Sequence, residues 1–293
     1  MSDFVEIVEV GPRDGLQNED ANISVEDKIE LIDKLSTCGF DRIEVGSFVS
    51  PKWVPQMADS DLVIKGLNLN KSISYSALTP NLKGLEDAIE AKVNEVAIFA
   101  SASESFSKAN INCSIKESID RIYPIMILAQ ENQLPVRGYV SCVTDCPFEG
   151  SVKPENVEVV ANRLLDLGCY EVSLGETLGR AGQQKIVNLL EHILQKIPAE
   201  KLAGHFHDTQ GVAIDNIKVA LEYGLRTFDS SVGGLGGCPY APGASGNVAT
   251  EKLVSFLKKY GYQTKVNEER INFVASFVKN LLKTSKSSNT DIC

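Results

Sequence analysis

The sequence predicts a TIM (β/α)8 barrel with additional C-terminal helices. Eight short apolar, β-branched runs recur along the 293 residues, and longer segments with helical periodicity separate them. Alternating strands and helices imply a parallel sheet covered on both faces, and eight such units favour a closed barrel over an open sheet. The first strand lacks the G-x-G-x-x-G turn, which weakens a dinucleotide-binding alternative further.

The expected elements follow the apolar patterns in order along the chain. The strands are expected at 5–10, 42–48, 74–78, 95–100, 136–143, 171–174, 203–207 and 227–232. The helices are expected at 25–38, 81–92, 115–132, 154–167, 184–196 and 215–223. Glycines at 39, 168 and 224 follow three of these helices and are expected to be their C-caps, a position that favours glycine.

We expect a single catalytic domain over residues 1–293, because no linker or change of composition divides the chain. Residues 251–282 are predicted to form additional helix packed against the barrel. The chain turns polar after Leu282, so residues from about 284 to 293 are expected to be a flexible tail.

Composition excludes several classes of function. The formal charge of −10, from 39 acidic and 29 basic residues, argues against nucleic-acid binding, which needs a clustered basic surplus. The sequence has no run of about eighteen apolar residues, so a membrane span is not expected. The N-terminus lacks a secretory or transit pattern, and seven scattered cysteines suit reduced thiols, so a cytoplasmic location is expected. Burial explains Cys142 and Cys146 better than zinc binding.

Working residues of such barrels cluster at the carboxyl ends of the strands and in the loops that follow them. The first strand ends in GPRDGLQNE at 11–19, which is either a surface turn or part of a site. In the second case Asp14 is a ligand for a hard cation, and Arg13 polarises a carbonyl or holds a carboxylate. Glu44, near the end of the second strand, is either solvated or paired with Arg13.

Two of the three histidines in the chain, His205 and His207, are two residues apart on the seventh strand and therefore face the same side. Two imidazoles with a carboxylate oxygen suit a divalent ion, whereas a lone buried histidine is more often structural. His192 lies in a helical segment and is expected on the surface.

The segment 233–247 contains six glycines, which favour a mobile loop and close backbone approach to a ligand, as at Gly236 and Gly237. Cys238 in this loop is a candidate acid or base, and Asn247 at its end is a candidate metal ligand. The alternative is a flexible lid without catalytic groups.

These segments together resemble the 3-hydroxy-3-methylglutaryl-CoA (HMG-CoA) lyase family. The resemblance rests on GPRDGLQNE, on HFHDT at 205–209, and on the loop GGLGGCPYAPGASGN at 233–247. The stretches SFVSPKWVPQM at 47–57 and NINCS at 110–114 are also similar to that family, and the match extends from about residue 5 to 253. The glycine loop with its cysteine is the most specific segment, because related isopropylmalate and homocitrate synthases share the Arg-Asp-Gly segment.

The resemblance implies cleavage of the C2–C3 bond of an acyl-CoA by metal-assisted retro-Claisen chemistry, with HMG-CoA giving acetyl-CoA and acetoacetate. It implies Mg²⁺ or Mn²⁺ as cofactor, a homodimer, and a place in leucine breakdown and ketone body formation. The implied metal ligands are Asp14, His205, His207 and Asn247. The implied catalytic residues are Arg13 at the enolate oxygen, Glu44 beside it, and Cys238 with His205 or Asp14 for proton transfer. The implied substrate contacts are Arg13, Gln17, Ser47, Ser173, Glu176, Gly236 and Gly237.

The chain departs from the family pattern at three places. Glu176 stands where the family usually has Asp, Asp20 stands where Lys is frequent, and the usual T-P-G turn is replaced by GQQ at 182–184. These changes leave open another 3-hydroxyacyl-CoA as substrate. A Claisen-type synthase or a non-catalytic metal-binding barrel are further alternatives. The family includes members whose terminal cysteine forms an intersubunit disulfide, which raises the same possibility for Cys293.

Overall fold

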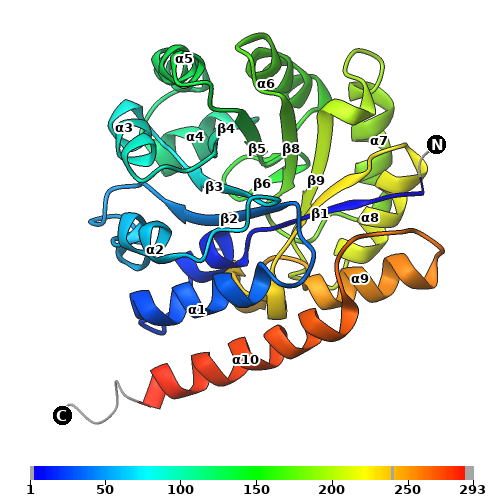
Figure 1. The fold of residues 1–293 in the computed structure, drawn as a ribbon. Helices are drawn as coiled ribbons and strands as arrows, with labels where there is room; N and C mark the ends of the chain where they lie inside the picture. Colours follow the sequence, from blue (N-terminus) through cyan, green and yellow to red (C-terminus); the bar gives the residue numbers. More distant parts are fainter. Residues whose placement is uncertain (1–2, 239–240, 288–293) are drawn as a thin grey trace.

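Eight strands form a closed barrel in the order β1-β10-β9-β8-β5-β4-β3-β2, and all neighbouring strands run parallel. The structure, a computed structural model, describes residues 3–238 and 241–287, without the side chains at 237, 238, 241–245 and 285–287. Helices surround the ring of strands (Figure 1). The TIM barrel predicted from the strand rhythm is therefore confirmed.

The barrel strands lie within two residues of their predicted ranges. They are β1 (Glu6–Glu9), β2 (Arg42–Ser47), β3 (Ser74–Leu78), β4 (Glu95–Ser101), β5 (Val136–Ser141), β8 (Glu171–Glu176), β9 (Leu202–Phe206) and β10 (Thr227–Ser230). The predicted helices are α1 (Val25–Leu35), α3 (Leu82–Glu90), α5 (Ile115–Glu131), α6 (Pro154–Asp166), α7 (Gln183–Ile193) and α8 (Ala213–Glu222).

Several short elements were not predicted. They are α2 (Ser60–Gly66), α4 (Glu104–Ile111), the π-helical turn η1 (Gly11–Gly15), the 3₁₀ turn η4 (Val232–Gly234), and two hairpins, β6 (Asp145–Cys146) with β7 (Gly150–Ser151) and β11 (Gly237–Cys238) with β12 (Ala241–Ser245). Each spans about two helical turns or fewer, so its sequence carries too few repeats for periodicity to be recognised.

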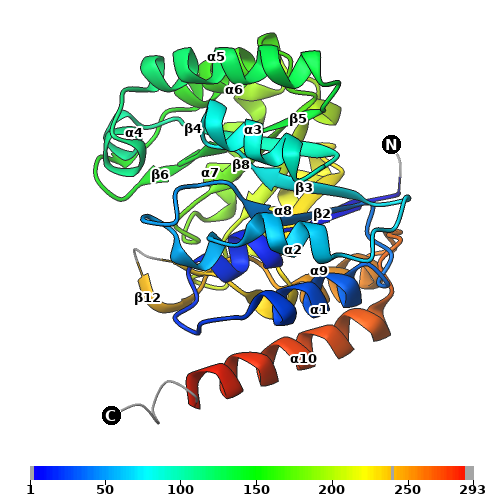
Figure 2. The same ribbon diagram turned by 60° about the vertical axis from the view of Figure 1, so that its left-hand side comes forward.

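The predicted C-terminal helix is two helices, α9 (Thr250–Lys259) and α10 (Glu268–Ser287). The chain turns between them at Gly261, whose φ is +82°. Figures 1 and 2 show α10 lying along the outside of α1 and α9, where Ile271, Val274 and Val278 are buried. Residues 284–287 belong to α10, and Cys293 lies outside the described residues. Among the described helices, none has both the length and the apolar character that a membrane span requires.

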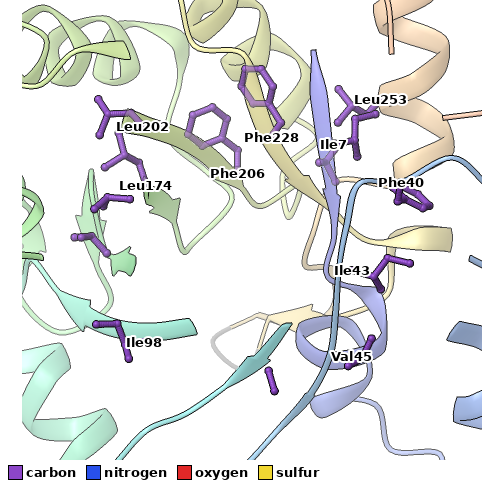
Figure 3. Packing of buried hydrophobic residues seen from close by; sticks show 14 of the residues in the cluster. Ile7, Phe40, Ile43, Val45, Ile98, Leu174, Leu202, Phe206, Phe228 and Leu253 are labelled. Atoms are coloured by element: carbon purple, nitrogen blue, oxygen red, sulfur yellow. The ribbon is translucent and has the colours of Figure 1, made fainter. Parts of the chain in front are cut away.

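The apolar core lies between the barrel and its helices. Figure 3 shows Ile43 and Val45 of β2, with Phe206 of β9 and Phe228 of β10, on the outer side of the strand ring. All four side chains are buried in one large cluster that includes the inner faces of the helices. Burial of apolar surface at this interface is the main contribution to the stability of the fold.

The inside of the barrel is polar. Arg42 on β2 donates to Glu171 on β8, and Tyr139 on β5 donates to Glu44 on β2, in each case between strands that are not neighbours. Such contacts cross the interior of the ring. Because successive strand residues face opposite sides, apolar residues face the helices and these charged residues face inwards.

Gly168 and Gly224 directly follow the C-caps of α6 and α8, as predicted, with φ of +112° and +96°. Gly39 was expected to cap the first helix, but α1 ends at Leu35 with Ser36 as its C-cap, and Gly39, with φ of +99°, lies in the turn beyond it. Gly39 is also closely packed, because a Cβ built on it would lie 2.3 Å from the carbonyl oxygen of Lys265. The neighbouring carbonyl of Cys38 accepts a hydrogen bond from the backbone N–H of Asn267. Gly39 therefore allows the α1–β2 turn to contact the segment that leads into α10.

We expect Gly39→Ala to lower the free energy of unfolding by about 2–4 kcal/mol, because it adds a backbone clash to the cost of about 1–2 kcal/mol for a left-handed residue. Gly261→Ala is the matched control, since Gly261 also has positive φ but no atom lies within 4 Å of an added Cβ. Chemical denaturation of both variants measures the difference. Equal losses would show that the contact with Lys265 contributes nothing.

Glu9 is a fully buried carboxylate on the outer side of β1. Its Oε1 accepts the backbone N–H groups of Gly11 at 2.8 Å and Val232 at 2.9 Å, and its Oε2 accepts the Thr250 hydroxyl at 2.7 Å. It thereby joins β1 and η1 to η4 and to the start of α9. Burial raises the pKa of Glu9 from 4.5 to about 7, although these hydrogen bonds oppose the shift.

The raised pKa predicts how stability depends on pH. Between pH 4.5 and about 7 the folded chain holds a proton on Glu9 that the unfolded chain has lost, so stability falls as pH rises through this window. The amide of Glu9→Gln retains the acceptor for both N–H groups. We therefore expect the free energy of unfolding of this variant to be about 1–3 kcal/mol above that of the wild type at pH 8 and equal to it near pH 4.5. Denaturation across this range measures the effect. The exposed Glu86→Gln is the control, and a constant difference at every pH would contradict the expectation.

Candidate functional site

The candidate site begins where β1 ends. In η1 the backbone N–H groups of Arg13, Asp14 and Gly15 all point at the carbonyl of Val10, at 3.2, 2.8 and 3.2 Å. This tight turn directs consecutive side chains over the mouth of the barrel. Active sites of this fold lie at this carboxyl-terminal end of the strands.

Arg13 and Glu44 form a buried bidentate ion pair. The Nε of Arg13 lies 2.8 Å from Oε1 of Glu44, and its Nη2 lies 3.0 Å from Oε2. The hydroxyl of Tyr139 donates to the same carboxylate at 2.6 Å. Glu44 was expected to be either solvated or paired with Arg13. In the structure it is paired with Arg13, and its side chain has no solvent exposure.

The remaining nitrogen of Arg13, Nη1, lies 2.5 Å from Oδ1 of Asp14. Burial disfavours the charge on Arg13, but the carboxylates of Glu44 and Asp14 outweigh it and hold the pKa of the guanidinium well above its usual range. Burial likewise opposes the charge of Asp14, yet Arg13 and both histidines lower the pKa of that carboxyl to about 2. Both groups are therefore charged at neutral pH.

Asp14, His205 and His207 form the cluster of possible metal ligands in the described residues, with ligand atoms within 4.8 Å of one another. The Nε2 atoms of the two histidines are 3.2 Å apart, and Nε2 of His205 is 3.8 Å from Oδ2 of Asp14. The Nδ2 of Asn247 lies 2.8 Å from the same Oδ2. A carboxylate and two imidazoles that converge in this way suit a divalent cation.

The two imidazoles differ in environment. Burial and the neighbouring His205 lower the pKa of His207 to about 4, so His207 is neutral at physiological pH, as a metal ligand must be. Burial also lowers the pKa of His205, but a hydrogen bond to Asp229 and the charge of Asp14 outweigh it and raise the pKa. The Nδ1 of His205 lies 3.1 Å from Asp229, which leaves Nε2 directed at the cluster. A carboxylate behind a histidine in this way orients metal ligands in many proteins.

Other predicted residues border this cluster. Gln17 donates to Oδ1 of Asp14 at 3.1 Å, and Ser173 donates to Asp229 at 2.7 Å. A Cβ built on Gly236 would lie 2.9 Å from Nδ2 of Asn247, so the glycine loop passes directly against the cluster. The backbone of Gly237 and Cys238 belongs to β11, and the side chain of Cys238 lies outside the described part.

Two predicted residues have no described side-chain contact with the cluster, although the backbone carbonyl of Glu176 accepts the N–H of His207 at 3.3 Å. Ser47 is buried at the end of β2, where its hydroxyl accepts the N–H of Val49. Glu176, at the end of β8, accepts a hydrogen bond from Thr144 at 3.4 Å. Burial raises the pKa of Glu176 to about 6, against the backbone N–H groups of the turn that follows it. Both lie at the carboxyl ends of strands, at the same end of the barrel as the cluster.

Three residues beneath the cluster are outside the set predicted from the sequence: Arg137, Tyr139 and Asp229. Each is at most 8% exposed and faces the interior of the barrel. A signal for two of them is present in the sequence, because Arg137 and Tyr139 are two residues apart in the otherwise apolar run of β5. Polar residues at this spacing share one face of a strand, and in a closed barrel that face is the interior.

The arrangement combines two functions at one place. The cluster of Asp14, His205 and His207 can hold a divalent cation, and the adjacent Arg13 supplies a fixed positive charge. A metal and a guanidinium side by side can bind two oxygens of one substrate and stabilise negative charge on one of them.

Comparison with known proteins shows the family to which the chain belongs. The family model described as HMGL-like matches residues 4–278. A hydroxymethylglutaryl-CoA lyase of Pseudomonas mevalonii is 52% identical over 98% of this chain and 96% of its own length. A 3-hydroxy-3-isohexenylglutaryl-CoA/hydroxymethylglutaryl-CoA lyase of Pseudomonas aeruginosa is 55% identical over 90% of this chain and 88% of its own.

A solved structure is similar over nearly the whole fold. It is an HMG-CoA lyase of Acinetobacter baumannii in complex with coenzyme A and 3-methylmalate, at 39% identity and a TM-score of 0.92, over 97% of this chain and 92% of that one. The family match and these relatives extend across the barrel, the Arg13 turn and the histidine pair. The chain is therefore a member of the HMGL-like family.

Proposed function

We propose that this chain is a lyase that cleaves the C2–C3 bond of HMG-CoA to give acetyl-CoA and acetoacetate. The observation that carries the proposal is the contact of 2.5 Å between Arg13 and Asp14, which places a guanidinium beside the candidate metal ligands. The close relatives named as HMG-CoA lyases support this reaction and an acyl-CoA substrate.

The proposed cofactor is Mg²⁺ or Mn²⁺, held by Asp14, His205, His207 and the side-chain oxygen of Asn247. The amide of Asn247 faces Asp14 through Nδ2, and rotation of the amide brings Oδ1 to that position. When bound, the cation orients the oxygens of the substrate and lowers the pKa of the 3-hydroxyl.

The reaction requires loss of the 3-hydroxyl proton while the C2–C3 bond breaks and a thioester enolate forms. His205 or Asp14 accepts this proton, because both lie at the cluster. Arg13 stabilises the enolate oxygen, whose negative charge develops mainly in the transition state. Its bidentate pair with Glu44 fixes the guanidinium before the substrate arrives, so little reorganisation is needed.

The enolate carbon must then receive a proton before acetyl-CoA leaves. Cys238 is the proposed donor, carried by the loop that passes against Asn247 at Gly236. Closure of this loop over the substrate also excludes water, which protects the enolate. Gln17, Ser47, Ser173 and Glu176, with the backbone of Gly236 and Gly237, are the proposed substrate contacts.

A second acyl-CoA is a specific alternative substrate. The Pseudomonas aeruginosa relative is named for both 3-hydroxy-3-isohexenylglutaryl-CoA and HMG-CoA. Glu176, in place of the usual Asp, is one methylene longer at the end of a strand, a change that can shift the preferred acyl group. The reaction would be the same with either substrate.

We propose that the enzyme acts in the cytoplasm. Five of the seven cysteines are buried and free, which is typical of a reducing compartment such as the cytoplasm. A role in leucine breakdown or ketone body formation follows from the proposed products, and we propose a homodimer by resemblance to the family.

Acetoacetate release from HMG-CoA by the purified protein with Mg²⁺ tests the proposed reaction. Arg13→Gln should lower kcat by about 10³-fold, because it removes the charge at the enolate oxygen. Arg163→Gln on the exposed side of α6 is the control and should keep wild-type activity. Absence of acetoacetate with the wild type would refute the reaction, and full activity of Arg13→Gln would refute the role of this residue. Turnover of 3-hydroxy-3-isohexenylglutaryl-CoA in the same assay decides the acyl preference.

Removal of the metal with a chelator should abolish turnover, and Mn²⁺ should restore it. We expect His207→Gln to weaken Mn²⁺ binding to the metal-free protein by at least about 10-fold, because a ligand is lost. His192→Gln is the matched control, since His192 pairs with Glu158 on the outside of the barrel. Isothermal titration calorimetry measures the affinities. Undiminished activity after chelation would contradict a metal-dependent mechanism.

A further inference from the structure

We propose that Arg137 is a positioning residue that holds both halves of the active site, the Arg13–Glu44 pair and the metal ligand His205, in register with each other. Arg137 touches neither half directly and acts through one intermediate side chain on each side. The inference deepens the function proposed above and rests on its metal ligands and on Arg13.

The first link runs from Arg137 to Arg13. The Nη1 of Arg137 donates to the hydroxyl oxygen of Tyr139 at 3.0 Å, and the guanidinium lies 5.1 Å from the centre of that ring. The Tyr139 hydroxyl in turn donates a hydrogen bond to Oε2 of Glu44 at 2.6 Å. Because Arg137 occupies the acceptor side of the hydroxyl, the proton of Tyr139 is directed at the carboxylate that fixes Arg13.

The second link runs from Arg137 to the metal ligands. Its Nη2 lies 2.8 Å from Oδ1 of Asp229, an ion pair whose atoms are not aligned as a hydrogen bond. The other oxygen of Asp229 lies 3.1 Å from Nδ1 of His205 and accepts the Ser173 hydroxyl at 2.7 Å. Asp229 is thus held from one side by Arg137 and orients the imidazole on its other side.

The third nitrogen of Arg137 anchors the residue. Its Nε lies 2.8 Å from Oε1 of Glu171, and Arg42 contacts the same oxygen at 2.9 Å from the floor of the barrel. With the side chain only 2% exposed, the guanidinium has no solvent to replace a lost partner. Each of its three nitrogens therefore has a different partner: Glu171, Tyr139 and Asp229.

Only a planar fork can serve three partners in three directions. A lysine at this position would retain the charge but would concentrate it on one ammonium, which cannot reach both Tyr139 and Asp229 with the same geometry. The charge of Arg137 alone is thus insufficient, and its shape couples the two halves of the site.

Mn²⁺ titration of the metal-free protein, followed by electron paramagnetic resonance, and steady-state kinetics at saturating Mn²⁺ separate the two links. Arg137→Lys should weaken Mn²⁺ binding by about 10–100-fold, the loss typical when the support of a ligand is removed, and should also lower kcat. Asp229→Asn should reproduce the loss of metal affinity. Tyr139→Phe should lower kcat and leave the Mn²⁺ affinity within about twofold of the wild type.

Double variants test the connection itself. If Arg137 acts on the metal through Asp229, adding Arg137→Lys to Asp229→Asn should cause no further loss of Mn²⁺ affinity. Asp229→Asn and Tyr139→Phe are nearly isosteric, so both should fold even if Arg137→Lys is unstable. Arg42→Lys is the control, because it also alters a buried guanidinium bonded to Glu171 but contacts neither Tyr139 nor Asp229.

Four results would overturn the inference. One is a lower thermal stability of Arg137→Lys with unchanged Mn²⁺ affinity and unchanged kcat, which would make Arg137 merely structural. Another is a loss of Mn²⁺ affinity without a loss of kcat in Arg137→Lys, or the reverse. A third is the same pattern in Arg42→Lys, which would trace the losses to general disturbance of the barrel. The last is full additivity in the double variant. A wild type that binds no Mn²⁺ would instead refute the proposed metal site.

Discussion

Three guanidinium groups lie inside the barrel, and each is matched by carboxylates at hydrogen-bonding distance. Arg13 pairs with Glu44 and Asp14, while Arg42 and Arg137 share Glu171. A charge left unpaired in such an interior costs several kcal/mol, so removal of one member would destabilise the rest. The fold tolerates this interior because its apolar core lies outside the strands, against the helices.

This division of the two strand faces explains how the site is held in place. Outward-facing side chains such as Ile43 pack the strands against the helices. Inward-facing neighbours such as Glu44 lie on the same strands, so this packing also fixes the backbone that carries them. Arg13 and Asp14 come from a turn rather than a strand, but Glu9 binds that turn to η4 and α9. The strand residues and the turn residues of the candidate site are thus held by different sets of contacts.

The charged residues of the site also form two neighbouring regions that suit ligands of opposite charge. The cluster of Asp14, His205 and His207 is suited to a cation, and the neighbouring Arg13 is suited to an anion. Asp14 belongs to the cluster and also pairs with Arg13, and it remains ionised because the positive groups around it outweigh its burial. A cation and a guanidinium would repel each other at this range without such a carboxylate between them.

The sequence by itself determined the order and bounds of the eight barrel strands, because each carries enough apolar residues to show its period. It also predicted Asp14, His205, His207 and Asn247 as metal ligands, and the structure brings these four residues together. Only the tertiary structure decided that Glu44 pairs with Arg13, and that Arg137 and Asp229 lie beneath the cluster. Glu44 is 31 residues from Arg13, and Asp229 is more distant still from Arg137 along the chain. Local patterns show which face of a strand a residue occupies, but closure of the barrel sets which residues meet across it.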